Sequence, residues 1–193
     1  MLYHARFFRF LLVCAICRLP HPAPAKNLNV LFLGDQGPHQ PARRFAELAP
    51  ALARRGVELT YTDDVSVLRL DRLQPYDALV LYANIDEIHP DHAQALLAYV
   101  EGGSGFVPLH CASYCFRNSP EMVALMGAQF LRHGTGVFRT RQANVEHPIL
   151  EGYSGFESWD ETYVHHLHNE QDRTVLTYRI DAGKLGQPLD VVR

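Results

Sequence analysis

Short apolar runs alternate with amphipathic stretches over the first half of the chain. Four of the runs have the length and composition of β-strands: residues 29–33, 58–62, 77–82 and 106–109. Residues 42–55 and 90–101 space their apolar side chains as one face of a helix does, and Gly56 follows the first of them as a stop. The β-α-β-β-α-β order predicts an α/β protein with a mostly parallel, doubly wound central sheet.

The pattern changes after residue 127. Residues 137–142 and 174–179 have the character of β-strands. The segment before the first of them ends in Gly-Thr-Gly, which predicts a turn that exposes His133. No internal repeat is present, and 193 residues are the length of one domain.

Residues 102–116 carry the most chemical information. Two glycines end a helix, residues 106–109 follow as a short buried strand, and His110 and Cys111 come directly after it. In parallel sheets, ligands bind beyond the carboxyl ends of the strands, and a strand-to-helix turn often holds a nucleophile, a base or a metal ligand. We therefore expect His110 at the carboxyl end of a central strand, beside a pocket.

The loops after the first and third strands should reach the same edge of the sheet. Gln36 and His39 follow the first strand, and Asn84 follows the third. Pro38 and Pro41 frame His39 in a rigid loop. These polar side chains are candidates for binding a substrate near His110.

Composition and charge narrow the function classes. The chain is 47% hydrophobic and 20% charged, with a formal net charge of −3, which is ordinary for a globular protein. Its basic residues form no stripe, which argues against nucleic acid as a partner. No segment reaches the roughly 20 apolar residues of a membrane span. The 11 histidines are many for this length and favour a metal or acid–base site.

Residues 1–25 resemble a secretory signal peptide. A basic start precedes a short apolar core, and Ala23-Pro24-Ala25 supplies the small residues of a cleavage site. Such a leader predicts a periplasmic or secreted protein. An upstream extension or a tail is the alternative, and the protein would then be cytoplasmic.

Cysteine spacing gives little support to a structural metal site. Cys14 and Cys17 lie in the leader, and Cys111 and Cys115 lie four residues apart with no second pair. This is not the spacing of a zinc ribbon. We expect two thiols that pack near the turn, and a disulfide between them only if the turn is not a regular helix.

Several segments together resemble the ThuA-like proteins of trehalose utilisation. They are residues 105–110 (Gly-Phe-Val-Pro-Leu-His), 130–136 (Phe-Leu-Arg-His-Gly-Thr-Gly), 147–149 (His-Pro-Ile) and 159–163 (Trp-Asp-Glu-Thr-Tyr). The resemblance covers residues 28–179 and implies a domain over residues 28–193. It also implies the class I glutamine amidotransferase-like superfold, a flavodoxin-like three-layer α/β sandwich.

The chain departs from that superfold in two ways. His110 stands where the superfold has its catalytic cysteine in a Gly-x-Cys-x-Gly elbow, so glutamine amidotransfer is not expected. Cys111 is one residue further on and lacks the glycine that a strained elbow needs. The family also continues into a final strand with a Gly-His-Asp-type motif, which is absent here. The resemblance therefore implies a domain that is incomplete at its C-terminal end.

The candidate catalytic residues are His110, Glu161 and His133. An imidazole suits proton transfer near neutral pH, and a buried carboxyl beside an aromatic ring suits acid–base work. In a strand, Trp159 and Glu161 would share one face. Zinc is a possible cofactor, built from His110, Glu161 and a third histidine, either His133 or His39. The candidate substrate-binding residues are His39, Gln36, Asn84, Cys111, Trp159 and Tyr163. The tract His165-His166-x-His168 is interpreted as a solvated polar run.

Three functions stay open on the sequence. The first is an enzyme that processes a disaccharide, such as trehalose, or a keto-sugar. The second is a non-catalytic sugar-binding or accessory module on the same fold, and the third is an amidohydrolase that uses Cys111. The expected ligand is a small sugar, and a sugar dehydrogenase or a second copy of the chain is a possible protein partner.

Overall fold

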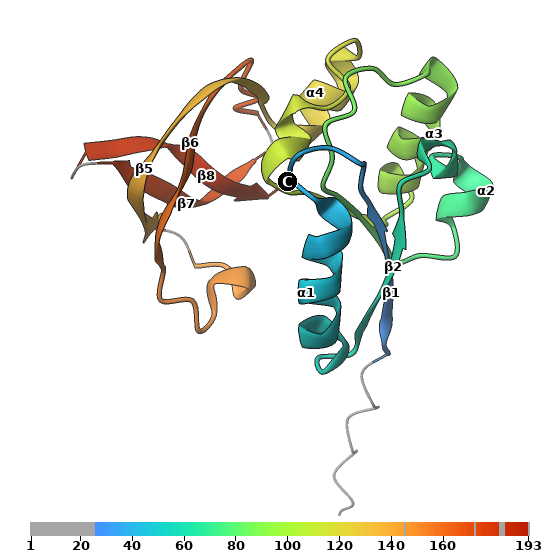
Figure 1. Ribbon diagram of the computed structural model, residues 1–193, viewed down its shortest axis with the longest axis horizontal. Coiled ribbons are helices and arrows are strands. Elements are labelled where there is room, and N and C mark those ends of the chain that lie inside the picture. Colours follow the sequence, from blue (N-terminus) through green and yellow to red (C-terminus); the bar gives the residue numbers. More distant parts are fainter. Residues whose placement is uncertain (1–25, 145, 172, 182–183, 193) are drawn as a thin grey trace, which may run out of the picture.

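A parallel four-stranded sheet forms the first half of the molecule (Figure 1). The computed structural model describes residues 26–144, 146–171, 173–181 and 184–192, so the predicted signal peptide at residues 1–25 lies outside the described residues. The strands are β1 (Leu28–Leu33), β2 (Val57–Thr62), β3 (Ala78–Leu81) and β4 (Gly105–Pro108), in the order β2-β1-β3-β4. All three pairings are parallel, which confirms the predicted α/β class.

Helices cover both faces of this sheet and make three layers. Side chains of β1 alternate between the faces because successive residues of a strand point to opposite sides. Val30 and Phe32 pack with Phe45 of α1 (Pro41–Ala53) on one face. Leu31 and Leu33 pack on the other face, in the core beneath the remaining helices. These helices are α2 (Leu70–Leu73), α3 (Pro90–Glu101) and α4 (Pro120–Met126), with the short 3-10 helix η1 (Val65–Val67) before them.

A second sheet forms the other half of the molecule (Figure 1); the sequence predicted parts of two of its strands, at residues 137–142 and 174–179, but not a separate sheet. It is antiparallel, in the order β6-β5-β7-β8. Its strands are β5 (Gln129–Gln142), β6 (Glu157–His166), β7 (Thr174–Asp181) and β8 (Lys184–Val192), with the 3-10 helix η3 (Pro148–Leu150) after β5. The turn predicted around His133 is wrong, because β5 runs through Gly134 and Gly136 and pairs with β6 there.

The expectation of a buried, central fourth strand is also wrong. Among the described residues, β4 is the outer strand of the parallel sheet, next to β3. Val107 at its middle is 43% exposed. The strand ends at Pro108, which has no backbone N–H to donate. The end of β4 is therefore open toward the second sheet rather than enclosed by neighbouring strands.

The helices of the described residues are too short or too polar to cross a bilayer. This agrees with the sequence, which contains no apolar run of sufficient length.

Candidate functional site

His110 is placed by a sharp turn at the end of β4. It begins the 3-10 helix η2 (His110–Tyr114) and has a positive φ of 49°, in the left-handed region. A non-glycine residue in this region is strained by roughly 1–3 kcal/mol and is held there by its surroundings. Its backbone carbonyl accepts a hydrogen bond from Ser113 Oγ at 3.2 Å. The strained elbow of this chain therefore presents an imidazole.

His39 reaches His110 from the loop between β1 and α1. The two rings meet edge-on, with centroids 4.9 Å apart. Asp35 fixes the loop, because its carboxylate accepts hydrogen bonds from the backbone N–H groups of Gly37 at 2.7 Å and Asn84 at 2.5 Å. A β-carbon at Gly34 would lie 2.5 Å from Pro41 Cβ, so only glycine allows α1 to start this close to the sheet.

Glu161 and His133 come from the second sheet. In the pairing of β5 with β6, Thr135 lies opposite Glu161 and His133 lies opposite Tyr163, so both side chains reach the same region. Glu161 Oε2 lies 3.4 Å from His110 Nε2, and Glu161 Oε1 lies 3.5 Å from His133 Nε2. One carboxylate therefore stands between two imidazoles, 51 and 28 residues away along the chain.

Tyr163 completes the aromatic surroundings of His110. Its ring stacks on His110, with centroids 4.7 Å apart and planes 28° from parallel. Phe130 meets the Tyr163 ring edge-on, with centroids 4.7 Å apart. Burial, and then the nearby Glu161 carboxylate, raise the pKa of the Tyr163 phenol far above its usual value. The phenol therefore stays protonated and offers a hydrogen-bond donor at the site.

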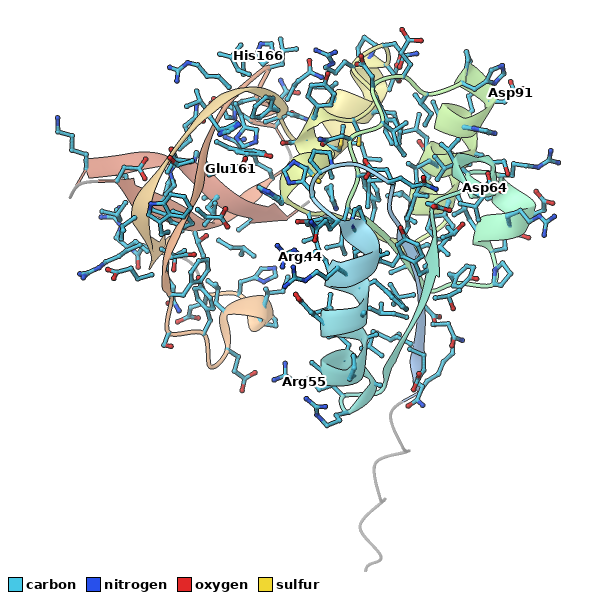
Figure 2. The ribbon with its side chains drawn as sticks, in the orientation of Figure 1. Arg44, Arg55, Asp64, Asp91, Glu161 and His166 are labelled. Carbon is cyan, nitrogen blue, oxygen red and sulfur yellow. The ribbon has the colours of Figure 1, made fainter. Side chains whose placement is uncertain are left out.

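The site opens into a cleft of about 620 Å³ between β4 and the second sheet. Its walls include His110, Glu161 and Tyr163, together with apolar side chains such as Phe156. A mostly apolar cavity with a few converging polar groups is the usual form of a small-molecule site. Figure 2 labels one residue from each half of the molecule: Arg44 on α1 of the parallel half and Glu161 on β6 of the antiparallel half.

The electrostatics keep His110 neutral at neutral pH. Burial lowers the pKa of His110 below its usual value, and the neighbouring His39 lowers it further. Glu161 acts in the opposite direction on the same pKa but does not outweigh the burial. A neutral imidazole can accept a proton or bind a metal ion. Among the described residues, His39, His110 and Glu161 form the one group that could hold a metal ion.

Cys111 and Cys115 are buried free thiols. Burial raises the pKa of each to about 12, and the neighbouring thiol adds to the effect on Cys111. The Cys115 thiol donates to the carbonyl oxygen of Ala83 at 2.9 Å and accepts from the N–H of Ile85 at 3.2 Å. Both cysteines therefore pack beneath the turn, as expected, and no disulfide joins them although the turn is a 3-10 helix.

The other residues expected to bind substrate are more dispersed. Gln36 bonds to Asp63 beyond β2, with 3.0 Å between its Nε2 and the carboxylate oxygen. If the oxygen and nitrogen of the Asn84 amide are exchanged, its nitrogen can donate to the carbonyl oxygen of Cys111 at 3.2 Å, so this side chain faces the turn at His110. Trp159 is 69% exposed, so the aromatic ring beside Glu161 belongs to Tyr163 instead. Trp159 does lie two residues before Glu161 on β6, but its side chain points into solvent.

Sequence reasoning missed the connection made by His165. Its Nε2 lies 3.1 Å from Ser113 Oγ, which links β6 to the helix that begins with His110. The predicted solvated run at residues 165–168 is therefore wrong for His165, which is half-buried. Asp160 was also missed, although it lines the cleft and its carboxylate accepts from the N–H of Glu161 at 2.8 Å. No local pattern signals either contact.

Comparisons with known proteins place the chain in a family. The family model described as "ThuA: Trehalose utilisation" matches residues 29–187. A ThuA-like protein from Bacteroides uniformis has a solved structure with 24% identity and a TM-score of 0.65, over 82% of this chain and 71% of that one. Another from Parabacteroides merdae has 19% identity and a TM-score of 0.69, over 80% and 69%.

Both solved structures share the fold of this chain, which supports the flavodoxin-like arrangement of the parallel half. Among curated proteins, none matches the chain at a significant level. The family model spans the elbow, the long strand β5 and the strand that carries Glu161. The chain therefore belongs to the ThuA family.

Proposed function

We propose that this ThuA-family protein is a carbohydrate-processing enzyme, which acts on a disaccharide such as trehalose or on a keto-sugar by proton transfer at His110, Glu161 and His133. The observation that carries the proposal is the position of Glu161 between two imidazoles, with oxygen-to-nitrogen distances of 3.4 and 3.5 Å. A carboxylate next to an imidazole fixes its tautomer and raises its basicity. Sugar hydroxyl and carbonyl groups react through such transfers.

The cleft supports a ligand of sugar size. Its volume of about 620 Å³ lies within the range of small-molecule sites. Phe156 lines the cleft and is 50% exposed, so its ring offers a face on which a sugar ring can stack. The protonated phenol of Tyr163 and the carboxylate of Asp160 lie in the same walls and can bond to hydroxyl groups.

Turnover tests the proposal directly. Trehalose, other disaccharides and their keto forms are incubated with the protein and followed by proton NMR. His110→Ala and Glu161→Gln should each lower turnover by about 100-fold or more, the usual range for acid–base groups. The double variant should be little worse than either alone, because the pair acts as one unit. His92→Ala and Glu87→Gln, which lie away from the cleft, are the matched controls.

The same experiment separates the alternatives. A sugar that binds but is never converted supports the non-catalytic binding module and contradicts the enzyme. An amide hydrolysis that stops when Cys111 is alkylated supports the amidohydrolase. That alternative is the weaker one because burial raises the pKa of Cys111 to about 12, which leaves almost no thiolate at neutral pH.

Export, a dehydrogenase partner and self-association stay predictions. Export rests on the leader-like residues 1–25, and the dehydrogenase rests on the family resemblance. Mass spectrometry of protein from its native host tests the first, because cleavage should occur at or near Ala25.

A further inference from the structure

We propose that His39, His110 and Glu161 together bind one divalent transition-metal ion, and that zinc fits this ligand set. The inference deepens the proposed function, since it names what the same site holds. Two imidazoles and one carboxylate are a ligand set that zinc uses in catalytic sites and that iron(II) uses in its facial sites.

The distances fit an ion held between the two halves of the molecule. One ligand atom from each of the three residues can be chosen so that all lie within 4.8 Å of one another. Zinc binds nitrogen and oxygen at about 2.0–2.2 Å, which places tetrahedral ligand atoms about 3.4 Å apart. His110 Nε2 and Glu161 Oε2 already lie 3.4 Å apart. The His39 ligand atom lies within 4.8 Å of the other two and completes the set.

An unsatisfied oxygen supplies independent evidence. Glu161 Oε2 is buried and, among the described residues, has no hydrogen-bond partner. A buried carboxylate oxygen without a hydrogen bond is costly, and a cation held between this oxygen and the His110 nitrogen would satisfy it. The other oxygen of Glu161 faces His133, which can hold the carboxylate in its ligating orientation.

The surrounding structure prepares the ligands. The left-handed backbone of His110 aims its ring at Glu161, and Asp35 fixes the loop that carries His39. The rings of His110 and His39 meet edge-on with centroids 4.9 Å apart, so the two imidazoles already stand side by side.

The ion would have a chemical use in the proposed reaction. Three protein ligands leave at least one coordination position open toward the cleft. When bound, the ion supplies Lewis-acid polarisation of a sugar oxygen or of a water molecule. With the ion bound, His110 and Glu161 would serve as its ligands, so the proton transfers proposed for this site would pass to His133.

Metal binding is measured on the full chain after treatment with a chelator. Zinc titration with elemental analysis should give one equivalent per chain, and cobalt(II) should give the visible bands of a low-coordinate nitrogen and oxygen site. His39→Ala, His110→Ala and Glu161→Gln should each weaken zinc binding by at least about 100-fold, more than the loss of an outer partner. Glu161→Asp keeps the carboxylate, so it should retain binding and shift the cobalt bands. Thermal melts without metal identify any variant that fails to fold.

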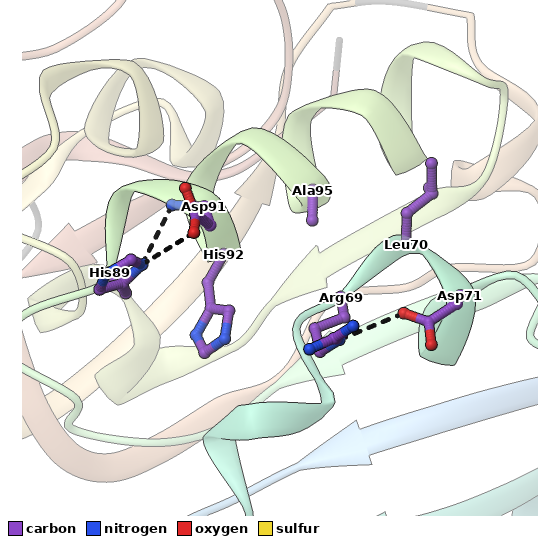
Figure 3. A pocket seen from close by; sticks show the side chains of 7 residues that line it. All are labelled: Arg69, Leu70, Asp71, His89, Asp91, His92 and Ala95. Carbon is purple, nitrogen blue, oxygen red and sulfur yellow. Dashed lines mark hydrogen bonds and ion pairs between the residues drawn. The ribbon is translucent and has the colours of Figure 1, made fainter.

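A second histidine cluster provides the matched control. His89, Asp91 and His92 line an open hollow of about 590 Å³ between α2 and α3, together with Arg69 (Figure 3). The cluster offers the same ligand types, but the side chains of His89 and Asp91 are mostly exposed. His92→Ala should leave zinc affinity unchanged, and His133→Ala should weaken it less than His39→Ala does.

The outcomes distinguish this inference from the proposed function. Absence of stoichiometric binding by zinc, cobalt(II), iron(II) and manganese(II) would overturn it, as would loss of binding in His92→Ala. If His133→Ala costs as much affinity as His39→Ala, the ligand set is wrong. Sugar turnover that resists chelation refutes the metal site and leaves the enzyme standing. One bound ion per chain with no turnover on any sugar supports the metal site and refutes the proposed enzyme.

Discussion

His165 should make the protein sensitive to acid, and the size of the effect follows from its burial. Burial lowers the pKa of His165 to about 4, with smaller contributions from His168, Arg179 and His166. An unfolded histidine has a pKa of about 6.5, so the unfolded chain binds this proton more readily than the folded one. The contribution of His165 to the free energy of unfolding is therefore fully present above pH 6.5 and is lost as the pH falls toward 4.

The magnitude is about 3 kcal/mol at pH 4. A pKa difference of about 2.5 units multiplied by 1.36 kcal/mol per unit gives this limit, as an order of magnitude. His165→Gln keeps a hydrogen-bonding side chain near Ser113 but cannot be protonated. At pH 7 the variant should lose only about 0.5–1.5 kcal/mol, the net contribution of one hydrogen bond.

The assay is urea unfolding of both proteins at pH 4, 5, 6, 7 and 8. The free energy of unfolding of the wild type should fall by about 3 kcal/mol more than that of His165→Gln between pH 7 and pH 4. Ser113→Ala removes the same hydrogen bond but leaves the buried imidazole in place, so this control should keep the acid sensitivity of the wild type. Parallel curves for the wild type and His165→Gln would refute the reasoning.

Three further predictions concern packing and reactivity. Leu96 is fully buried, so Leu96→Ala should lower the free energy of unfolding in urea by about 2–5 kcal/mol, whereas Leu70→Ala at a 39% exposed site should cost less than about 1 kcal/mol. Gly34→Ala should cost about 1–3 kcal/mol because its β-carbon meets Pro41, and Gly136→Ala, where nothing lies within 4 Å, is the control in the same melt. Iodoacetamide should modify Cys111 at pH 8 only in urea, because the thiol is buried and burial raises its pKa to about 12. Peptide mass spectrometry measures the labelling, and fast labelling of the native protein would contradict this.

The parallel half of the fold could be predicted from the sequence because its signals are local. Each strand is a short apolar run, and each major helix has an apolar stripe with a stop or a starting proline nearby. The boundaries of α3, at Pro90 and Glu101, agree with the sequence to the residue. The edge position of β4 could not be predicted, because the sequence of a strand does not state which neighbours it will have.

The second sheet was missed for a physical reason. Most of β5 is exposed, and its central residues, from Arg132 to Gly136, show no alternation of buried and exposed side chains. Glycines in a strand read as a turn when the sequence is considered alone. The proximity of His110 and Glu161 was expected from their chemistry, whereas the edge-on contact of His39 depends on a loop that Asp35 and Gly34 shape.

The two halves of the molecule each contribute part of the site, and this has a consequence for local stability. His39 and His110 belong to the parallel half, and Glu161 and His133 belong to the antiparallel half. A ligand that contacts both halves opposes any fluctuation in which one sheet separates from the other. Amide hydrogen exchange in β5 and β6 should therefore slow when the site is filled, both near the ligand and far from it. Such slowing would mean that the two halves open cooperatively, with the cleft as the hinge.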